Sequence, residues 1–234
     1  MTRLLVSVRN AQEAQAAHRG GAQLIDLKEP RQGSLGAVPP ADWPSIQAAL
    51  PSSVPLSVAL GELHEPECAE RARLAAGFQF AKVGLAHSRS WPDWLERWSA
   101  VIQALPTTVQ PVAVVYADAE RAAAPTRHQI LTAAQQLRCA AVLVDTFDKT
   151  HGSLLDLWSL TELEHFCHDV QSAGLLCVLG GSLSLQQIPQ LLPLTPDYIA
   201  VRGAVCEGDR TGPLRTELVA ALAQLVGQQL TTNN

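Results

Sequence analysis

The sequence lacks the features of proteins that bind nucleic acids or enter membranes. Its 17 Lys and Arg residues are outnumbered by 22 Asp and Glu residues, its formal net charge is -5, and it has no run of basic residues. Such a chain offers no electrostatic surface that could follow a phosphate backbone. No apolar run is long enough for a signal peptide or a membrane span. We therefore expect neither a nucleic-acid partner nor a membrane partner.

Disulfide, metal and dinucleotide signatures are missing as well. The five cysteines lie far apart without a CxxC pair, which is typical of a reducing compartment and predicts a cytoplasmic protein. The seven histidines are scattered, apart from His165 and His168 on one predicted helix, so they form no metal-binding set. No Gly-x-Gly-x-x-Gly turn follows the first apolar run, at residues 4–8. We expect no metal and no cofactor.

Short apolar runs alternate with segments of helical spacing along the whole chain. Near-continuous apolar strands separated by helices indicate a parallel sheet that is buried on both faces. Eight such units fit one closed (β/α)8 TIM barrel over residues 1–234, and the missing dinucleotide turn disfavours the alternative, an open doubly wound sheet. The expected strands are residues 4–8, 23–27, 56–60, 78–83, 112–116, 141–145, 175–179 and 198–201, and the clearest helices are residues 11–19, 68–76, 126–137, 154–172 and 214–226.

Lysine is scarce, with three residues against 14 arginines, and each lysine lies near the end of an even-numbered strand. Lys28 ends the second strand, Lys82 lies near the end of the fourth, and Lys149 follows the sixth. Because alternate strands fill the same layer inside a barrel, the three amines are expected to converge at its mouth. An amine with a lowered pKa can form a Schiff base with a carbonyl compound, which arginine cannot do. The alternative is an arginine-biased composition that left three lysines by chance.

Two carboxylates accompany the lysines. Asp26 precedes Lys28 by two residues, so strand alternation places both on one face, and Asp145 ends the sixth strand four residues before Lys149. Either carboxylate could hold or transfer a proton. The alternatives are a structural ion pair for Asp26 and a capping or turn role for Asp145.

Several loops after the predicted strands are candidates for binding phosphate or substrate. Barrels commonly build a phosphate site from the loops after the seventh and eighth strands, where backbone amides are available, although glycines there could simply turn the chain. The loop at residues 30–39 follows the second strand. Two polar residues follow the fifth, where a capping turn is an equal alternative to a place at the mouth. The candidates are Gly180, Gly181, Ser182, Arg202, Gly203, Ala204, Gly33, Ser34, Tyr116 and Asp118.

Trp91, Trp94 and Trp98 share one face of a predicted helix. This spacing is typical of core packing or of a contact in a homo-oligomer, so we assign these residues no chemistry.

A series of short segments resembles, in the same order, the (5-formylfuran-3-yl)methyl phosphate synthase family, also called 4-(hydroxymethyl)-2-furancarboxaldehyde-phosphate synthases. The chain departs from archaeal members at Glu29, where they have Asn, and in residues 206–210, which are less basic. The resemblance covers nearly the whole chain and rests on residues 26–30 (DLKEP), 33–37 (GSLGA), 82–85 (KVGL), 116–119 (YADA), 145–149 (DTFDK) and 201–204 (VRGA).

The resemblance implies a barrel that condenses two molecules of glyceraldehyde 3-phosphate into a furan phosphate, a step toward a methanofuran-type one-carbon carrier. It implies that Lys28 forms the Schiff base and that Lys82 accepts a proton. Asp26, Asp145 and Lys149 match further active-site residues, and the partner is a small triose phosphate. The rival hypotheses are another barrel aldolase or isomerase that acts on a phosphorylated sugar, and a barrel that binds a phosphorylated metabolite without catalysis.

Overall fold

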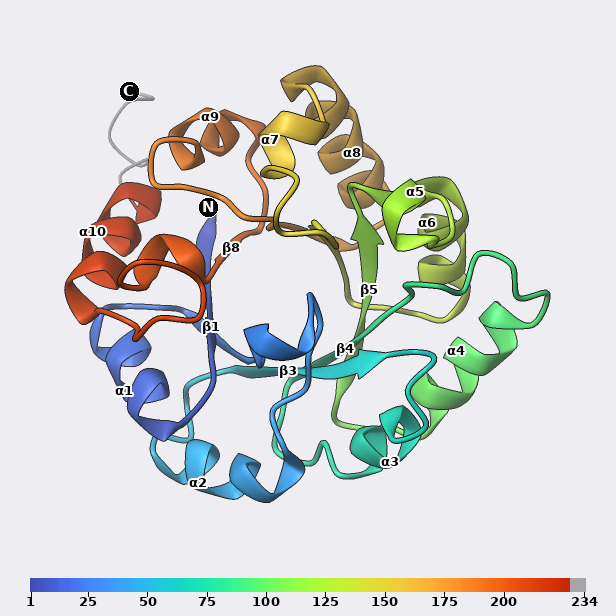
Figure 1. Cartoon of the computed structure of the whole chain (residues 1–234), viewed down its shortest axis with the longest axis horizontal. Coiled ribbons are helices and arrows are strands. Elements are labelled where there is room, and N and C mark those ends of the chain that lie inside the picture. The colour runs from blue at the N-terminus through green and yellow to red at the C-terminus, as the bar shows by residue number, and fades with distance from the viewer. Residues whose placement is uncertain (228–234) are drawn as a thin grey trace.

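The computed structural model describes residues 1–227, and in it eight parallel strands close into a barrel in sequence order, with β8 beside β1 (Figure 1). Residues 228–234 of the predicted 1–234 domain lie outside the described residues. All eight predicted strands are confirmed. They are β1 (Arg3–Val8), β2 (Leu24–Leu27), β3 (Leu56–Glu62), β4 (Phe80–Gly84), β5 (Gln110–Tyr116), β6 (Ala141–Asp145), β7 (Leu176–Leu179) and β8 (Tyr198–Val201).

Helices surround the ring of strands (Figure 1). Short 3-10 turns occur at Pro30–Gln32, Pro40–Asp42, Leu192–Leu194 and Gly203–Val205. No helix among residues 1–227 combines the length and the apolar character needed to cross a membrane. The α-helices are α1 (Ala11–Arg19), α2 (Trp43–Ala48), α3 (Cys68–Arg73), α4 (Trp94–Gln103), α5 (Ala119–Ala122), α6 (Arg127–Gln136), α7 (Leu154–Leu157), α8 (Leu160–Ser172), α9 (Ile188–Leu191) and α10 (Thr216–Gly227).

The predicted helix at residues 154–172 is wrong in one respect, because it is two helices. Ser159 has extended backbone angles, and its side chain accepts a hydrogen bond from the backbone N–H of Glu162, while the Glu162 carboxylate accepts from Ser159. This capping box starts α8 afresh and leaves α7 as a single turn. The result is a short α7 immediately after the loop that carries Lys149.

The strands bury both faces, as their apolar sequences predict. One apolar layer fills the barrel interior with side chains such as Leu5, Phe80 and Leu143. A second, larger layer lies between the strands and the surrounding helices, where Trp98 is buried and Trp91 and Trp94 pack partly buried, which confirms core packing for this face. In the described part of the barrel, apolar side chains therefore pack on both faces of the strands, and polar groups are found at the strand ends.

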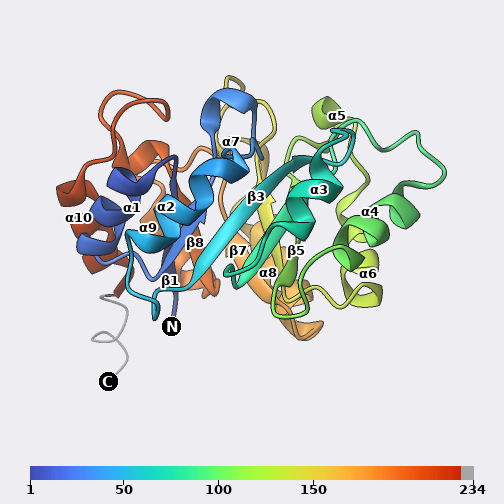
Figure 2. The same ribbon diagram turned by 90° about the horizontal axis from the view of Figure 1, so that it is seen from below.

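The two ends of the barrel differ. Figure 2 shows the N-terminus at the end where the strands begin and α5, which follows β5, at the opposite end. Polar and charged side chains that are buried inside the barrel, such as Asp26, Lys82 and Asp145, lie toward the carboxyl ends of their strands. This is the end at which barrel enzymes place their active sites.

Candidate active site

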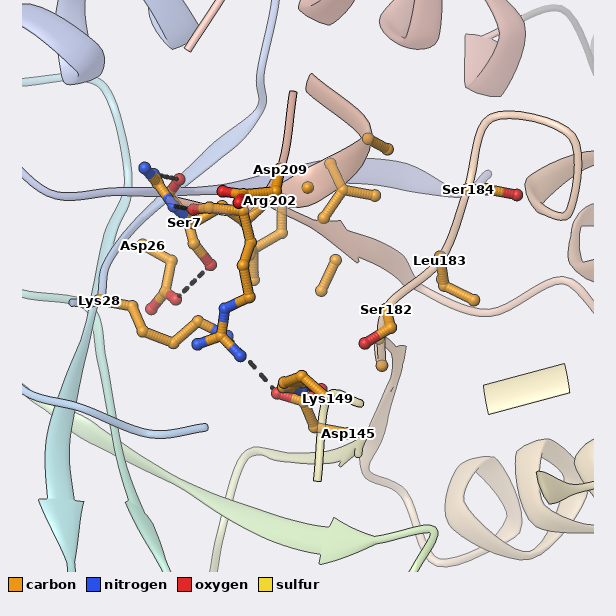
Figure 3. Close-up of a pocket in the computed structure, with 18 of the residues that line it drawn as sticks. Ser7, Asp26, Lys28, Asp145, Lys149, Ser182, Leu183, Ser184, Arg202 and Asp209 are labelled. Carbon is orange, nitrogen blue, oxygen red and sulfur yellow. Dashed lines mark hydrogen bonds and ion pairs between the residues drawn. The ribbon is translucent and has the colours of Figure 1, made fainter. Parts of the chain in front are cut away.

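A cavity of about 520 Å³ opens at the carboxyl ends of the strands, and all three lysines line it. Lys82 lies within β4, Lys28 directly follows β2, and Lys149 follows β6 by four residues. Asp26 and Asp145 line the same cavity. The convergence predicted from even-numbered strands is therefore present, and Figure 3 shows Lys28 and Lys149 approaching Asp145 from different sides.

The deepest part of the cavity is a buried ion pair between Lys82 and Asp26. Their side chains are 3% and 1% exposed, and the ammonium donates to the carboxylate. Strand register explains the contact set, because Asp26 lies opposite Ser7 on β1 and Ser57 on β3. The Ser7 hydroxyl donates to Asp26 over 3.0 Å, and Lys82 Nζ donates to Ser57 Oγ over 3.2 Å.

Burial lowers the pKa of Lys82, because a charged ammonium loses hydration inside the barrel, and the nearby Lys28 charge lowers it further. The Asp26 carboxylate opposes this effect without cancelling it. Lys82 is therefore a group that can give up its proton more easily than an exposed lysine, while Asp26 holds its position.

Asp145 is the point where the other two lysines meet. Its Oδ2 lies 3.5 Å from Lys28 Nζ, and its Oδ1 accepts hydrogen bonds from Lys149 Nζ and from the backbone N–H of Thr146. Ser34 donates to Oδ2 over 3.2 Å. Burial by itself would raise the pKa of Asp145, but the charges of Lys149 and Lys28 outweigh it and lower the pKa well below the usual range. Asp145 thus stays a carboxylate.

Lys149 and Lys28 differ in their surroundings. Burial, together with the charge of Lys28, lowers the pKa of Lys149 to about 8, although Asp145 acts in the opposite direction. Lys149 also donates to the Thr146 hydroxyl over 3.1 Å. The side-chain amine of Lys28 has the carboxylate of Asp145 as its one hydrogen-bond partner among residues 1–227, and at 3.5 Å this contact is long. The Lys28 amine is thus lightly held at the cavity wall.

The predicted phosphate loops line the same cavity. Gly181 has a φ of 103°, and a side chain there would meet Thr146 at 3.1 Å, so glycine allows the loop after β7 to lie against the loop after β6. Ser182 also has a positive φ, of 52°, and its hydroxyl lies 3.3 Å from that of Thr146. The residues of these loops at the cavity are Gly180, Gly181, Ser182, Arg202, Gly203 and Ala204.

The Arg202 side chain has a structural set of partners. Its guanidinium donates to the Glu13 carboxylate over 2.8 Å and to the Ser7 carbonyl oxygen over 2.9 Å, and it also contacts carbonyl groups of residues 210 and 212. Glu13 binds Arg9 as well. Because these groups occupy the guanidinium, Arg202 connects β8 with β1 and α1, while Gly203 and Ala204 line the cavity beside it.

Tyr116 and Asp118 do not line this cavity. The Tyr116 hydroxyl donates to Glu62, and the ring is 1% exposed. The two oxygens of Asp118 accept backbone N–H groups of Phe147 and Asp148 over 2.7 and 2.8 Å. Asp118 therefore holds the loop that carries Lys149, and the contacts of both residues are with other parts of the protein rather than with the main cavity.

The loop after β2 contributes through different residues. Ser34 contacts Asp145, as described above, and Gly33 lies in an adjoining groove. Arg210, which the sequence did not single out, donates from Nη2 to the carbonyl oxygens of Pro30 and Gly33 over 2.7 and 2.8 Å and lines both cavities. Arg210 belongs to no strand and to no recognisable motif, and the loop before α10 brings it to the site.

Within the described 1–227, no cluster of His, Cys, Asp and Glu is arranged to hold a metal ion.

Comparisons with known proteins show which family this chain is similar to. A family model described as 4-HFC-P synthase matches residues 4–223. A protein of Methanococcus maripaludis strain C7 named (5-formylfuran-3-yl)methyl phosphate synthase is 33% identical over 234 residues, covering 96% of this chain and 99% of the relative. A Methanopyrus kandleri protein of the same name is 36% identical over 231 residues, covering 95% and 98%.

Solved structures show a similar fold. A phosphoribosyl anthranilate isomerase from Thermotoga maritima superimposes with a TM-score of 0.66 at 16% sequence identity, covering 97% of this chain and 98% of the isomerase. At that identity the likeness concerns the barrel alone.

Proposed function

The chain belongs to the 4-HFC-P synthase family, and we propose on that basis that it condenses two molecules of glyceraldehyde 3-phosphate into (5-formylfuran-3-yl)methyl phosphate. Phosphate and water are lost in the reaction, so the enzyme would be a lyase. We propose that it works through a Schiff base. The furan phosphate would serve the biosynthesis of a methanofuran-type one-carbon carrier. The observation that carries the proposal is the convergence of three lysines and two carboxylates in one cavity beside two glycine loops.

Lys28 forms the Schiff base in this proposal. Its amine adds to the carbonyl carbon of one triose phosphate, directly or after isomerisation to the ketone, and water leaves as the iminium forms. The side chain is 12% exposed at the cavity, whereas Lys82 is 3% exposed and engaged by two side chains. Asp145 lies close enough to balance the positive charge of the iminium.

Lys82 then removes the acidified proton from the carbon beside the iminium, which leaves an enamine. Its lowered pKa favours this role, since a neutral amine is a base and an ammonium is not. The resulting Lys82 ammonium is stabilised by its ion pair with Asp26. The enamine carbon attacks the aldehyde of the second triose, and the new C–C bond places negative charge on the former aldehyde oxygen.

Lys149 is placed to protonate that oxygen. Its pKa of about 8 allows both the ammonium and the amine form near neutral pH, and Asp145 accepts its hydrogen bond. Loss of water and phosphate, ring closure and hydrolysis of the imine then release the furan. The loops at residues 180–182 and 202–204 supply backbone groups for the phosphate of the first triose.

Borohydride reduction in the presence of glyceraldehyde 3-phosphate tests the proposal. Intact-mass measurement should detect one triose adduct, peptide mapping should place it on Lys28, and a parallel assay should detect free phosphate and the furan. Lys28→Arg keeps the charge and the approximate length without a nucleophilic amine, so it should give no adduct and no measurable turnover.

The outcomes separate the rival hypotheses. An adduct on Lys28 without phosphate release would indicate an aldolase, and ligand-dependent stabilisation without an adduct would indicate a non-covalent isomerase or a binding protein. Substantial turnover by Lys28→Arg would refute the covalent mechanism.

A further inference from the structure

The condensation in the proposed function requires two phosphorylated trioses in one cavity, and the further inference rests on that function. Two phosphate dianions repel each other, especially where water is partly excluded. A site that brings their carbon chains together therefore needs separate positive groups for each phosphate. The glycine loops beside the main cavity serve one phosphate only, and the Arg202 guanidinium is occupied by Glu13 and backbone oxygens.

An adjoining groove of about 610 Å³ contains a concentration of positive charge. Arg31 comes from the 3-10 turn after β2, Arg121 from α5, and Lys149 and Arg210 form a wall that the groove shares with the main cavity. The one acidic residue of the lining, Asp148, already binds His151 and Thr150. Although the chain has a net charge of -5, the groove is locally positive and would attract an anion.

The guanidinium groups of the groove have donors to spare. Arg31 and Arg121 are exposed, and within residues 1–227 neither guanidinium has a hydrogen-bond or ion-pair partner. Arg210 is fixed through Nη2 by Pro30 and Gly33, which leaves Nε and Nη1 without a partner in the described structure. Planar guanidinium groups with free donors are well suited to phosphate oxygens.

We propose that this groove, formed by Arg31, Arg121 and Arg210 beside Lys149, binds the phosphate of the second triose. The second aldehyde then enters the main cavity past Lys149. Lys149 faces both spaces, so it can protonate the oxygen of this aldehyde as the C–C bond forms. The two phosphates are thereby held by different walls of the site.

The double variant Arg31→Ser, Arg121→Ser tests this assignment, because neither residue contacts the lysine cluster. The matched control is Arg19→Ser, Arg73→Ser, which removes two exposed arginines from the ends of α1 and α3, at the opposite end of the barrel. Both double variants change the net charge equally. Each is treated with glyceraldehyde 3-phosphate and assayed for the borohydride adduct on Lys28 and for furan and phosphate release, and circular dichroism checks that it is folded.

The groove variant should keep the Lys28 adduct within about twofold of the wild type and lose furan formation at low substrate concentration by about tenfold or more. The control should match the wild type in both assays. Unchanged furan formation in the groove variant, or a parallel loss of adduct and furan, would overturn the second phosphate site. A wild-type enzyme that forms neither adduct nor furan would instead refute the proposed function.

Discussion

Replacing Asp26 with Asn should destabilise the protein, because it leaves the Lys82 ammonium buried without a counter-charge. The two side chains are 1% and 3% exposed, so solvent screens the pair very little. Removing one partner of such a pair costs about 3–5 kcal/mol of the free energy of unfolding at neutral pH. The amide of Asn still accepts a hydrogen bond from Ser7 or Lys82, which makes the lower end of this range the expected value.

The cost should shrink as the pH rises, and the sign follows from proton linkage. Burial lowers the pKa of Lys82 already in the wild type, and without Asp26 it falls further. Between that folded-state value and about 10.5, the unfolded state binds more protons than the folded state, so the free energy of unfolding rises with pH. Urea titrations between pH 7 and pH 10 should show the variant approaching the wild type.

The matched control is the double variant Asp26→Asn, Lys82→Met, which removes the buried charge together with its partner. It should recover at least about half of the stability that Asp26→Asn loses at pH 7. A loss below about 1 kcal/mol for Asp26→Asn, or a loss that stays constant from pH 7 to pH 10, would refute the coupling between these two residues.

Two further predictions concern the rim of the site. The plot of kcat/KM against pH should fall through a descending limb near pH 8 as the Lys149 ammonium, the proposed general acid, loses its proton. Lys149→Arg keeps its proton throughout this range, so it should lack this limb and lose about 10²-fold or more of the rate. A limb that persists in the variant would assign it to another group. Tyr116→Phe should lower the free energy of unfolding by about 1–3 kcal/mol in urea titrations, because it leaves Oε1 of the buried Glu62 without its donor while Oε2 keeps the backbone N–H of Ala86, yet kcat/KM should change less than about threefold. A large rise in KM for this variant would indicate that Tyr116 contacts the substrate.

The strands could be predicted from the sequence because buried strands are almost entirely apolar. Residues 141–145 and 198–201 have the predicted limits, and the other strand ends shift by at most two residues. A parallel strand that is covered by helices outside and by side chains inside needs apolar residues on both faces, so it stands out in the sequence. The helix predicted over residues 154–172 was wrong because Ser159 and Glu162 form a capping box, a signal that the sequence does contain.

The lysine cluster was predictable for a geometric reason, whereas the surrounding polar roles were not. Alternation between strands places Lys28, Lys82 and Lys149 at one end of any barrel with this strand order. The partners of Tyr116 and Arg202, by contrast, are Glu62 and Glu13, which lie 54 and 189 residues away in sequence. No local pattern reveals such pairs, so the sequence did not show that the Tyr116 hydroxyl and the Arg202 guanidinium are already occupied.

The three lysines differ in how tightly a carboxylate binds each of them. Asp26 binds Lys82 through one oxygen, and Ser7 donates to its other oxygen. In the proposed mechanism, this lysine is therefore held in place for its role as the base. Asp145 is shared, and its tighter contact goes to Lys149, which leaves Lys28 with a contact of 3.5 Å. A nucleophile has to leave its partner and reach a carbonyl carbon, and Lys28 gives up the least in doing so. In the proposed mechanism the iminium on Lys28 is positively charged, so at that stage Asp145 has one positive group near each of its oxygens.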